Sequence, residues 1–236
     1  MTKIIAHRGA IGHSYVENTL EAFERAIELG CDMVEFDVRR TKDNVLVVFH
    51  DRVFNDLPIK LSNYDTLESE AAKSGFHLPE LEEVLNICKG RIFMDIEVKE
   101  HGFEKKLLRE LDKVVSVNEY SIKSFNDKVP YTIKQLRPEI TVGLLLGKEK
   151  AGVKRRLNEL FPLRRLKDCK ADFVSPQYRF LVPGYVKYLK KAGFPIYVWT
   201  INDKKNIIKA LSKEVDGIIT DRPDRALVIR SNYTKD

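Results

Sequence analysis

The stretch MVEFDVRRTKDNVLVVFHD, residues 33–51, predicts a strand that carries two acidic side chains on one face. Apolar and charged residues alternate from 34 to 39, and successive side chains of a strand point to opposite faces. Glu35 and Asp37 are therefore expected on the same face, two residues apart. A strand that only has to cover one side of a core does not need this pair.

A turn and a returning strand are expected to follow. Residues 41–44 suit a tight turn because Asp and Asn tolerate positive φ, and residues 45–49 are mainly apolar. His50 would lie opposite Asp37 if the loop has two residues, and opposite Glu35 if it has four. Either register places a histidine beside two carboxylates that the same hairpin holds together.

Two interpretations of this hairpin stay open on its own sequence. Neighbouring carboxylates need a proton or a cation between them, because their repulsion would otherwise raise one pKa sharply. A divalent ion that prefers oxygen ligands is the simplest answer. Alternatively, the hairpin lies at the surface and its charges are solvated, which is a common arrangement. The remaining sequence has to separate these two interpretations.

The composition is that of an ordinary globular protein. With 236 residues, 43% of them hydrophobic, the chain can build a large core, and we expect one domain over residues 1–236. No apolar run is long enough to cross a bilayer, and the start MTKIIAHRGA lacks the apolar length of a signal peptide, so we expect a cytoplasmic protein. The cysteines, Cys31, Cys88 and Cys169, are too widely spaced for a disulfide framework or a zinc knot.

The net charge of +6 gathers partly in residues 148–170. Such a run could attract nucleic acid or an anionic membrane, but charged helix faces are usually just solvated. The run contains no interleaved aromatic platform and no nucleic-acid-binding motif, so no nucleic-acid partner is expected. A weak contact with a membrane surface is the one further role that this run could serve.

Strands and helices alternate along the whole chain. The expected strands are 3–6, 33–38, 91–99, 116–122, 141–146, 172–175, 195–200 and 217–220, and the expected helices are 18–29, 78–88, 103–114, 127–136, a basic helical stretch in 148–170, 183–192, 203–211 and one from 223. Asn18 and Glu21 have the spacing of a capping box, which predicts a helix beginning at Asn18. Eight strands, each followed by a helix, predict a (β/α)₈ TIM barrel, with a hairpin and a short insertion after the second strand. A doubly wound open sheet is the alternative, but the chain has no glycine-rich phosphate-binding loop to support it.

Functional residues of a TIM barrel lie at the carboxyl ends of its strands. Asp95, Glu97 and Lys99 share one face of their strand, so a third carboxylate and a cation are expected at the same opening as Glu35 and Asp37. This convergence favours a binding site over a surface hairpin. The other residues expected at strand ends are His7, Arg8, Ser124, Phe125, Gln177, Trp199, Thr200 and Asp221.

Three carboxylates without a cysteine form an oxygen-rich set. Glu35, Asp37 and Glu97 therefore suit one divalent cation, Mg²⁺ or Ca²⁺, rather than zinc. His7 and His50, whose ordinary pKa values lie near neutrality, can act as a general acid and a general base on opposite sides of a reacting group.

Two cations complete the expected set. Arg8 can bind two phosphate oxygens at once, and Lys99 adds a second positive charge. A metal ion, two cations and an acid/base pair are what a displacement at a phosphodiester needs: the non-bridging oxygens are neutralised, a nucleophile is deprotonated and a leaving group is protonated.

In this order along the chain, the motifs resemble the signature of the glycerophosphodiester phosphodiesterase family. The similarity spans almost the whole chain and comprises His7-Arg8, Glu17-Asn18, Glu35-x-Asp37, His50-Asp51, Ile96-Glu97-Val98-Lys99, Ser124-Phe125, Val198-Trp199-Thr200 and the closing run from Asp216 to Pro223.

The resemblance implies a TIM barrel that hydrolyses glycerophosphodiesters, small molecules, to sn-glycerol 3-phosphate and an alcohol. By position it implies metal ligands at Glu35, Asp37 and Glu97, an acid/base pair at His7 and His50, and cations that face the phosphate at Arg8 and Lys99. It further implies attack by the neighbouring glycerol hydroxyl, which gives a cyclic phosphate that water then opens. We assign His7 as the base and His50 as the acid.

The substrate-binding wall is expected at two aromatic residues. Trp199 is the only tryptophan and is expected to form a wall for the glycerol or alcohol group, and Phe125 is placed either at the lip of the site or in packing. Asp221 is expected to cap the last helix or to orient its neighbours rather than to bind metal. After Asp51 the chain departs from the family's usual loop, which leaves the head group undetermined.

Two rival functions remain. The first is a lysophospholipase D or a phosphoinositide phospholipase C-like enzyme that uses the same barrel. The second is a catalytically silent barrel that binds an anion or a partner protein, although no binder requires both histidines and all three carboxylates.

Overall fold

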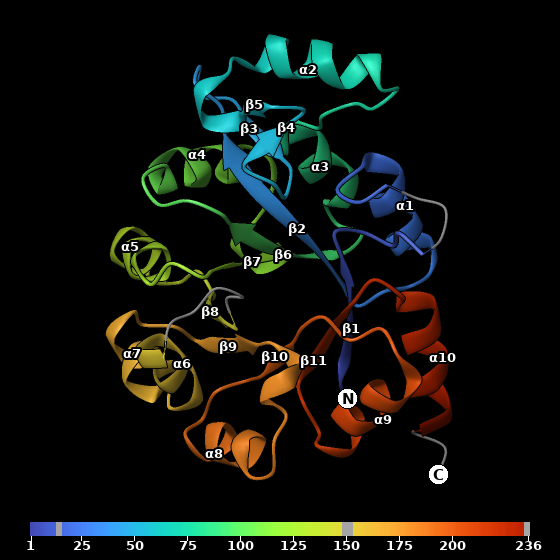
Figure 1. Ribbon diagram of the computed structural model, residues 1–236, viewed down its shortest axis with the longest axis vertical. Helices are drawn as coiled ribbons and strands as arrows, with labels where there is room; N and C mark the ends of the chain where they lie inside the picture. Colours follow the sequence, from blue (N-terminus) through green and yellow to red (C-terminus); the bar gives the residue numbers. More distant parts are fainter. Residues whose placement is uncertain (13–15, 148–152, 234–236) are drawn as a thin grey trace.

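Parallel strands form a nearly closed barrel with helices on its outside, as Figure 1 shows for the computed structural model, which describes residues 1–12, 16–147 and 153–233. The barrel strands are β1 (Lys3–His7), β2 (Met33–Arg40), β6 (Phe93–Val98), β7 (Tyr120–Ser124), β8 (Val142–Leu146), β9 (Phe173–Pro176), β10 (Tyr197–Val198) and β11 (Gly217–Thr220). Their spatial order is β10-β11-β1-β2-β6-β7-β8-β9. The predicted TIM barrel is thereby confirmed, and the alternative of an open sheet is wrong.

The last seam of the barrel, between β9 and β10, is held by two single bridges instead of a continuous ladder. They join Val174 to Ile196 and Gln177 to Trp199. Side chains reinforce the seam: the Ser175 hydroxyl donates to the carbonyl of Tyr197 (2.7 Å), and the Trp199 indole N–H donates to the carbonyl of Ser175 (2.9 Å). Closure of the cylinder therefore depends partly on these two side chains.

Helices cover the outer face of the strands. They are α1 (Leu20–Glu28), α3 (Leu81–Cys88), α4 (Glu104–Val114), α5 (Lys128–Leu136), α6 (Val153–Leu160), α7 (Leu163–Asp168), α8 (Tyr185–Lys191), α9 (Lys204–Ser212) and α10 (Pro223–Tyr233). None of the helices in the described ranges has the length and apolar character that a bilayer-spanning segment needs.

Both faces of β2 are buried, which separates the two interpretations of the 33–51 hairpin. Val34, Phe36 and Val38 face outward into the core between strands and helices, where the rings of Phe36 and Phe23 lie 5.6 Å apart. Glu35 and Asp37 lie on the other face, which points into the barrel, and their exposed fractions are 2% and 1%. The interpretation as a solvated surface hairpin is therefore wrong.

A small insertion lies between β2 and α3, at the top of Figure 1. It contains β3 (Leu46–Val48), which pairs antiparallel with β2, the two short strands β4 (Val53–Phe54) and β5 (Leu57–Pro58), and helix α2 (Tyr64–Lys73). Its own core is Val47, Ile59, Leu67, Ala71 and Leu78. The prediction of a short insertion after the hairpin did not include a helix, because Leu67 and Ala71 form only one buried stripe on the otherwise charged α2.

Several expected boundaries differ by a few residues from those of the structure, and two of these differences have a clear local cause. The strand predicted at 116–122 is shifted, because Ser116 and Glu119 form a capping box that makes 117–119 a 3₁₀ turn before β7 begins at Tyr120. The helix predicted from Asn18 begins at Leu20, because Thr19 is the N-cap and accepts from the backbone N–H of Ala22. The basic stretch forms α6 and α7, and its residues 148–152 lie outside the described part of the chain.

His77 lies in the loop before α3 and connects two helices. Its Nδ1 is 2.8 Å from Glu68 of α2, and its Nε2 is 3.1 Å from Glu83 of α3. Partial burial opposes the charge on the ring, but the hydrogen bonds to these two carboxylates outweigh it and raise the pKa of His77 above its ordinary value.

We expect His77 to give this protein a stability that depends on pH. A raised pKa in the folded state stabilises the fold at pH values below the unfolded pKa, near 6.5, and this contribution is lost as the pH rises through the raised value. Thermal unfolding of His77→Gln should therefore show a smaller gain in Tm between pH 8 and pH 6 than the unaltered protein. An equal gain in both proteins would show that another group is responsible.

Candidate active site

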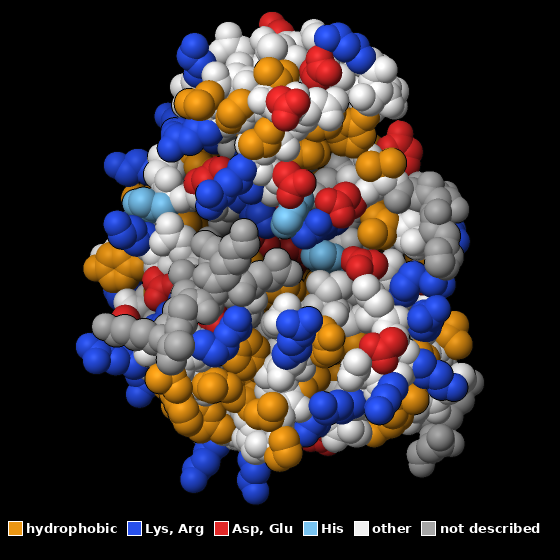
Figure 2. Space-filling model, viewed as in Figure 1, with side chains coloured by type: hydrophobic (Ala, Val, Ile, Leu, Met, Phe, Trp, Pro, Cys, Tyr) orange, Lys and Arg blue, Asp and Glu red, His pale blue; other side chains and the backbone are white. Residues whose placement is uncertain are grey.

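Many of the residues expected at the strand ends line one cavity of about 430 Å³, but its lining does not include Asp37, Asp95, Ser124, Gln177, Thr200 or Asp221. Figure 2 shows the hollow near the centre of the face in view, with acidic side chains inside it and histidine side chains at its edge. Its lining includes His7, Arg8, Glu35, His50, Glu97, Lys99, Lys123, Phe125, Leu145, Trp199 and Ile219.

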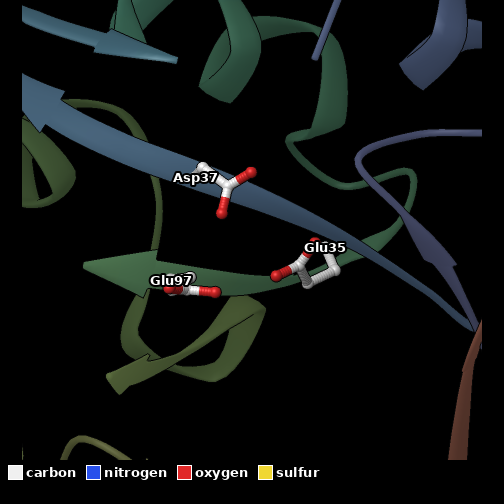
Figure 3. A group of neighbouring side chains, drawn as sticks. All are labelled: Glu35, Asp37 and Glu97. Atoms are coloured by element: carbon white, nitrogen blue, oxygen red, sulfur yellow. The ribbon is translucent and has the colours of Figure 1, made fainter. Parts of the chain in front are cut away.

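Parallel pairing of β2 with β6 brings the three carboxylates together. The register sets Glu35 beside Asp95 and Asp37 beside Glu97, so every second residue of both strands faces the interior. Oxygen atoms of Glu35, Asp37 and Glu97 all lie within 4.8 Å of one another. Figure 3 shows them pointing from the two strands into a common space.

This set fits a hard divalent cation. Three buried carboxylates with no nitrogen or sulfur donor among them offer the oxygen ligands that Mg²⁺ and Ca²⁺ prefer. Their buried negative charge also requires positive charge close by, because unpaired buried ions are strongly disfavoured.

Lys99 and Arg8 supply part of that positive charge. The Nζ of Lys99 lies 2.9 Å from Asp37 and 2.7 Å from Glu97, and the Nε of Arg8 lies 3.2 Å from Asp37. The guanidinium of Arg8 also donates to Glu17 (2.8 Å), which holds it at the edge of the cavity. The backbone of Arg8 adopts φ 56°, an uncommon conformation that lets its N–H approach Glu35 (3.3 Å).

The pKa values of Asp37 and Glu97 shift in opposite directions. Burial opposes the charge on Asp37, but Lys99 and Arg8 outweigh it and lower its pKa below the ordinary value. For Glu97 burial is the largest effect and, together with the charges of Asp37 and Glu35, raises its pKa in spite of Lys99. A further positive charge among the three would favour the ionised form of Glu97.

His7 is held by an aspartate. Its Nδ1 lies 2.6 Å from Asp221, whose other oxygen accepts from Asn202 (2.6 Å), while its Nε2 points towards Glu35, 4.0 Å away. Burial opposes ionisation of Asp221, but His7 outweighs it and lowers the carboxyl pKa, so this side chain acts as an acceptor. The proton of a neutral His7 therefore lies on Nδ1, which leaves Nε2 free to accept one.

His50 reaches the cavity by a different route from either predicted register. Val38 pairs with Val48 and Thr41 with Val45 across a three-residue loop, which would place His50 opposite Phe36 and not opposite an acid. Both predicted loop lengths are therefore wrong. Strand β3 ends before His50, and Arg39 binds the His50 carbonyl through two N–H groups (2.9 and 2.6 Å), while Asp51 lies 2.8 Å from its Nδ1.

An apolar wall lies opposite the charged groups. The rings of Phe125 and Trp199 meet edge to face with centroids 5.5 Å apart, and Leu145 and Ile219 line the same side. The cavity thus has one charged half and one apolar half, as sites for small polar molecules with an organic substituent commonly do.

Two side chains take part in ways that the sequence analysis did not predict. Asn18 was expected only to cap a helix, but its Nδ2 donates to Asp37 (3.0 Å). Lys123 lies below the carboxylates and binds Asp95 (2.6 Å), which faces the interior one layer lower than Glu97. The period-2 pattern of β7 could have placed Lys123 on the inner face, because it alternates with Ile122 and Ser124.

We expect Asn18→Gly to lower turnover by ~10-fold, since partners that orient metal ligands are commonly worth that much. Glycine tolerates the φ of 57° at this position, so the change removes the amide without straining the backbone. The matched control is Thr19→Ala, which should cost about 1 kcal/mol of unfolding free energy through the lost N-cap but leave turnover unchanged. Equal turnover for Asn18→Gly and the unaltered protein would show that Asp37 needs no such support.

Comparisons with known proteins agree with this geometry. The model of the "Glycerophosphoryl diester phosphodiesterase family" matches residues 7–225. A glycerophosphodiester phosphodiesterase from Caldanaerobacter subterraneus subsp. tengcongensis is 31% identical over an alignment 241 positions long, and the alignment covers 94% of this chain and 95% of the relative. The crystal structure of a glycerophosphodiester phosphodiesterase from Parabacteroides distasonis is 29% identical, covers 98% of both chains and superposes with a TM-score of 0.84.

A more distant structure shares the fold. It is that of an Oleispira antarctica phosphodiesterase in complex with the product sn-glycerol-3-phosphate, with a TM-score of 0.82, 23% identity and coverage of 97% of this chain and 96% of the other. The family match spans nearly the whole chain and confirms the resemblance seen in the motifs. This chain belongs to the glycerophosphoryl diester phosphodiesterase family, a family of phosphoric diester hydrolases.

Proposed function

We propose that this protein hydrolyses glycerophosphodiesters to sn-glycerol 3-phosphate and an alcohol, with one Mg²⁺ or Ca²⁺ ion held by Glu35, Asp37 and Glu97. The observation that carries the proposal is the meeting of these three carboxylates and two histidines around a single cavity. The family match supports the same reaction class.

His7 is the base of the first step in this proposal. Its Nε2 takes the proton of the glycerol hydroxyl next to the phosphate, the hydroxyl oxygen bonds to phosphorus, and the bond from phosphorus to the alcohol oxygen breaks. His50 gives a proton to that departing oxygen. The product of the step is a cyclic phosphate and a free alcohol, so atoms and charges balance.

The second step uses the same pair in reverse. His50, now neutral, takes a proton from water, whose oxygen bonds to phosphorus and opens the ring. His7 returns its proton to the glycerol oxygen that leaves phosphorus. Asp221 supports both steps, because its carboxylate keeps the ring of His7 in one orientation and stabilises the protonated form.

The cations act on the phosphate. When bound, the divalent ion would withdraw charge from a non-bridging oxygen of the phosphate. Arg8 and Lys99 both contact Asp37, and in this proposal they bind the remaining oxygens of the phosphate. We place the alcohol group against Phe125 and Trp199, whose apolar surface accepts a small organic substituent without a charged partner.

The test is turnover of glycerophosphocholine, measured as release of sn-glycerol 3-phosphate with Mg²⁺ or Ca²⁺ present. Lysophosphatidylcholine in micelles, tested in parallel, separates this function from a lysophospholipase D, which would prefer the lipid. Release of neither product with any divalent ion would contradict the proposal and favour a barrel that only binds an anion.

A further inference from the structure

Among the described residues that line the cavity, Lys123 is the lysine or arginine that the proposed reaction does not use. It projects from β7 to the bottom of the cavity, where it is 1% exposed. Its Nζ donates to one oxygen of Asp95 (2.6 Å), and the hydroxyl of Ser121 donates to the other (2.9 Å). Asp95 is therefore fully occupied by its two neighbours on β7.

The same ammonium group lies 3.3 Å from Oε1 of Glu35. Burial opposes its charge, but Asp95 and then Glu35 outweigh burial and raise the pKa of Lys123 above the ordinary value. Lys123 is thus a fixed positive charge that touches both a buried carboxylate below the site and one of the three carboxylates at the site.

The two oxygens of Glu35 consequently have different surroundings. Oε1 lies 3.3 Å from the ammonium group of Lys123, whereas Oε2 accepts a hydrogen bond from the backbone N–H of Arg8 (3.3 Å) and lies 4.0 Å from Nε2 of His7. A carboxylate can bind a cation with both oxygens only if both are free to turn towards it. At Glu35 a neighbouring cation already engages one of them.

We propose that Lys123 is a positioning residue that engages Oε1 of Glu35, so that Glu35 would bind the ion through one oxygen only and the site favours Mg²⁺ over Ca²⁺. The inference rests on the proposed function, because it concerns the ion of that same site. Mg²⁺ takes six single-oxygen ligands in a tight octahedron, whereas Ca²⁺ takes six to eight and commonly uses both oxygens of a carboxylate. Restricting one acid to one oxygen therefore removes an option that only Ca²⁺ exploits.

The ratio of the Ca²⁺ Kd to the Mg²⁺ Kd isolates the effect of Lys123 on metal preference. A nearby positive charge repels both divalent ions alike, so the loss of Lys123 should lower the Kd of both. Only the effect of Lys123 on how Glu35 binds the ion changes the ratio of the two Kd values. A residue with a purely structural role would leave the ratio of the two Kd values unchanged.

The experiment is titration calorimetry of the whole protein with Mg²⁺ alone and with Ca²⁺ alone, without substrate. The test variant is Asp95→Asn/Lys123→Met, which removes both charges of the buried pair together and leaves no buried carboxylate without its partner. We expect the ratio of the Ca²⁺ Kd to the Mg²⁺ Kd to fall by ~10-fold in this variant. Asp95→Asn alone keeps Lys123 beside Glu35 and should keep the original ratio.

A folded double variant with the original ratio would overturn the assignment of Lys123. If that variant does not fold, Asp95→Asn/Lys123→Gln replaces the ion pair with two amides and serves for the same comparison. Absence of metal binding by the unaltered protein would overturn this inference together with the metal dependence of the proposed function. Normal binding and the expected ratio in a protein without turnover would contradict the proposed function alone.

Discussion

Turnover of the His7→Ala variant should be at least ~100-fold lower than that of the unaltered protein, because a positioned general base contributes about that much or more. Nε2 of His7 is the ring nitrogen that remains once Asp221 engages Nδ1, and among the described residues that line the cavity His50 is the only other imidazole. His50→Ala should lose a similar factor through the missing acid. Steady-state kinetics with glycerophosphocholine measures both.

Two comparisons make this result specific. His101→Ala changes an exposed histidine that pairs with Glu104 and should retain full turnover. Asp221→Asn keeps the shape of the partner of His7 but not its charge, so we expect reduced turnover with the ring still in place. Near-normal turnover of His7→Ala would remove that residue from the mechanism and leave the choice of base open.

Removing divalent ions with EDTA is expected to reduce turnover by ~1,000-fold, since stabilising phosphate charge by a metal is worth several kcal/mol. Addition of Mg²⁺ or Ca²⁺ should restore the activity. Glu97→Gln should behave like the metal-free protein at low ion concentration and recover in part at high concentration. The matched control is Glu110→Gln on α4, an acid that pairs with lysines outside the site and should leave the ion requirement unchanged.

Full activity in EDTA would contradict the metal-dependent reaction. The three carboxylates would then serve to bind Lys99 and Arg8, and the charge on the phosphate would have to be stabilised by those cations alone. Loss of activity in EDTA without rescue by either ion would instead indicate that the chelator destabilises the fold, which the Tm of the treated protein would reveal.

Much of this molecule follows from local patterns in the sequence. The alternation in residues 33–38 places Glu35 and Asp37 on one face, and the regular succession of strands and helices predicts that Glu97 arrives at the same end of the barrel. These inferences work because side-chain direction in a strand depends only on its period of two. The parallel register that sets Asp37 beside Glu97 then follows from closure of the barrel.

Other features depend on contacts that local sequence does not contain. The hairpin has a three-residue loop because the hydroxyl of Thr41 binds both Asp43 and the backbone of Val45, and this choice decides the register of His50. Asn18 and Thr19 are both good N-cap residues. The side chain of Asn18 binds the distant carboxylate of Asp37, and Thr19 caps the helix. Such choices are settled by tertiary partners and not by propensity.

Lys123 is a third case of the same kind. A lysine inside a strand is normally taken as an exposed side chain, and only its pairing with Asp95, 28 residues away, makes burial tolerable. The sequence shows both residues but not that β6 and β7 lie side by side with Asp95 next to Ser121.

The seam between β9 and β10 gives this protein a built-in optical probe. Its only tryptophan, Trp199, donates to Ser175 across the seam and meets Phe125 at the wall of the cavity. Intrinsic fluorescence excited at the indole band therefore arises from one place that senses both closure of the cylinder and filling of the site. Without any label, a red shift in denaturant would follow the parting of these two strands, and quenching at constant fold would follow the arrival of a small molecule.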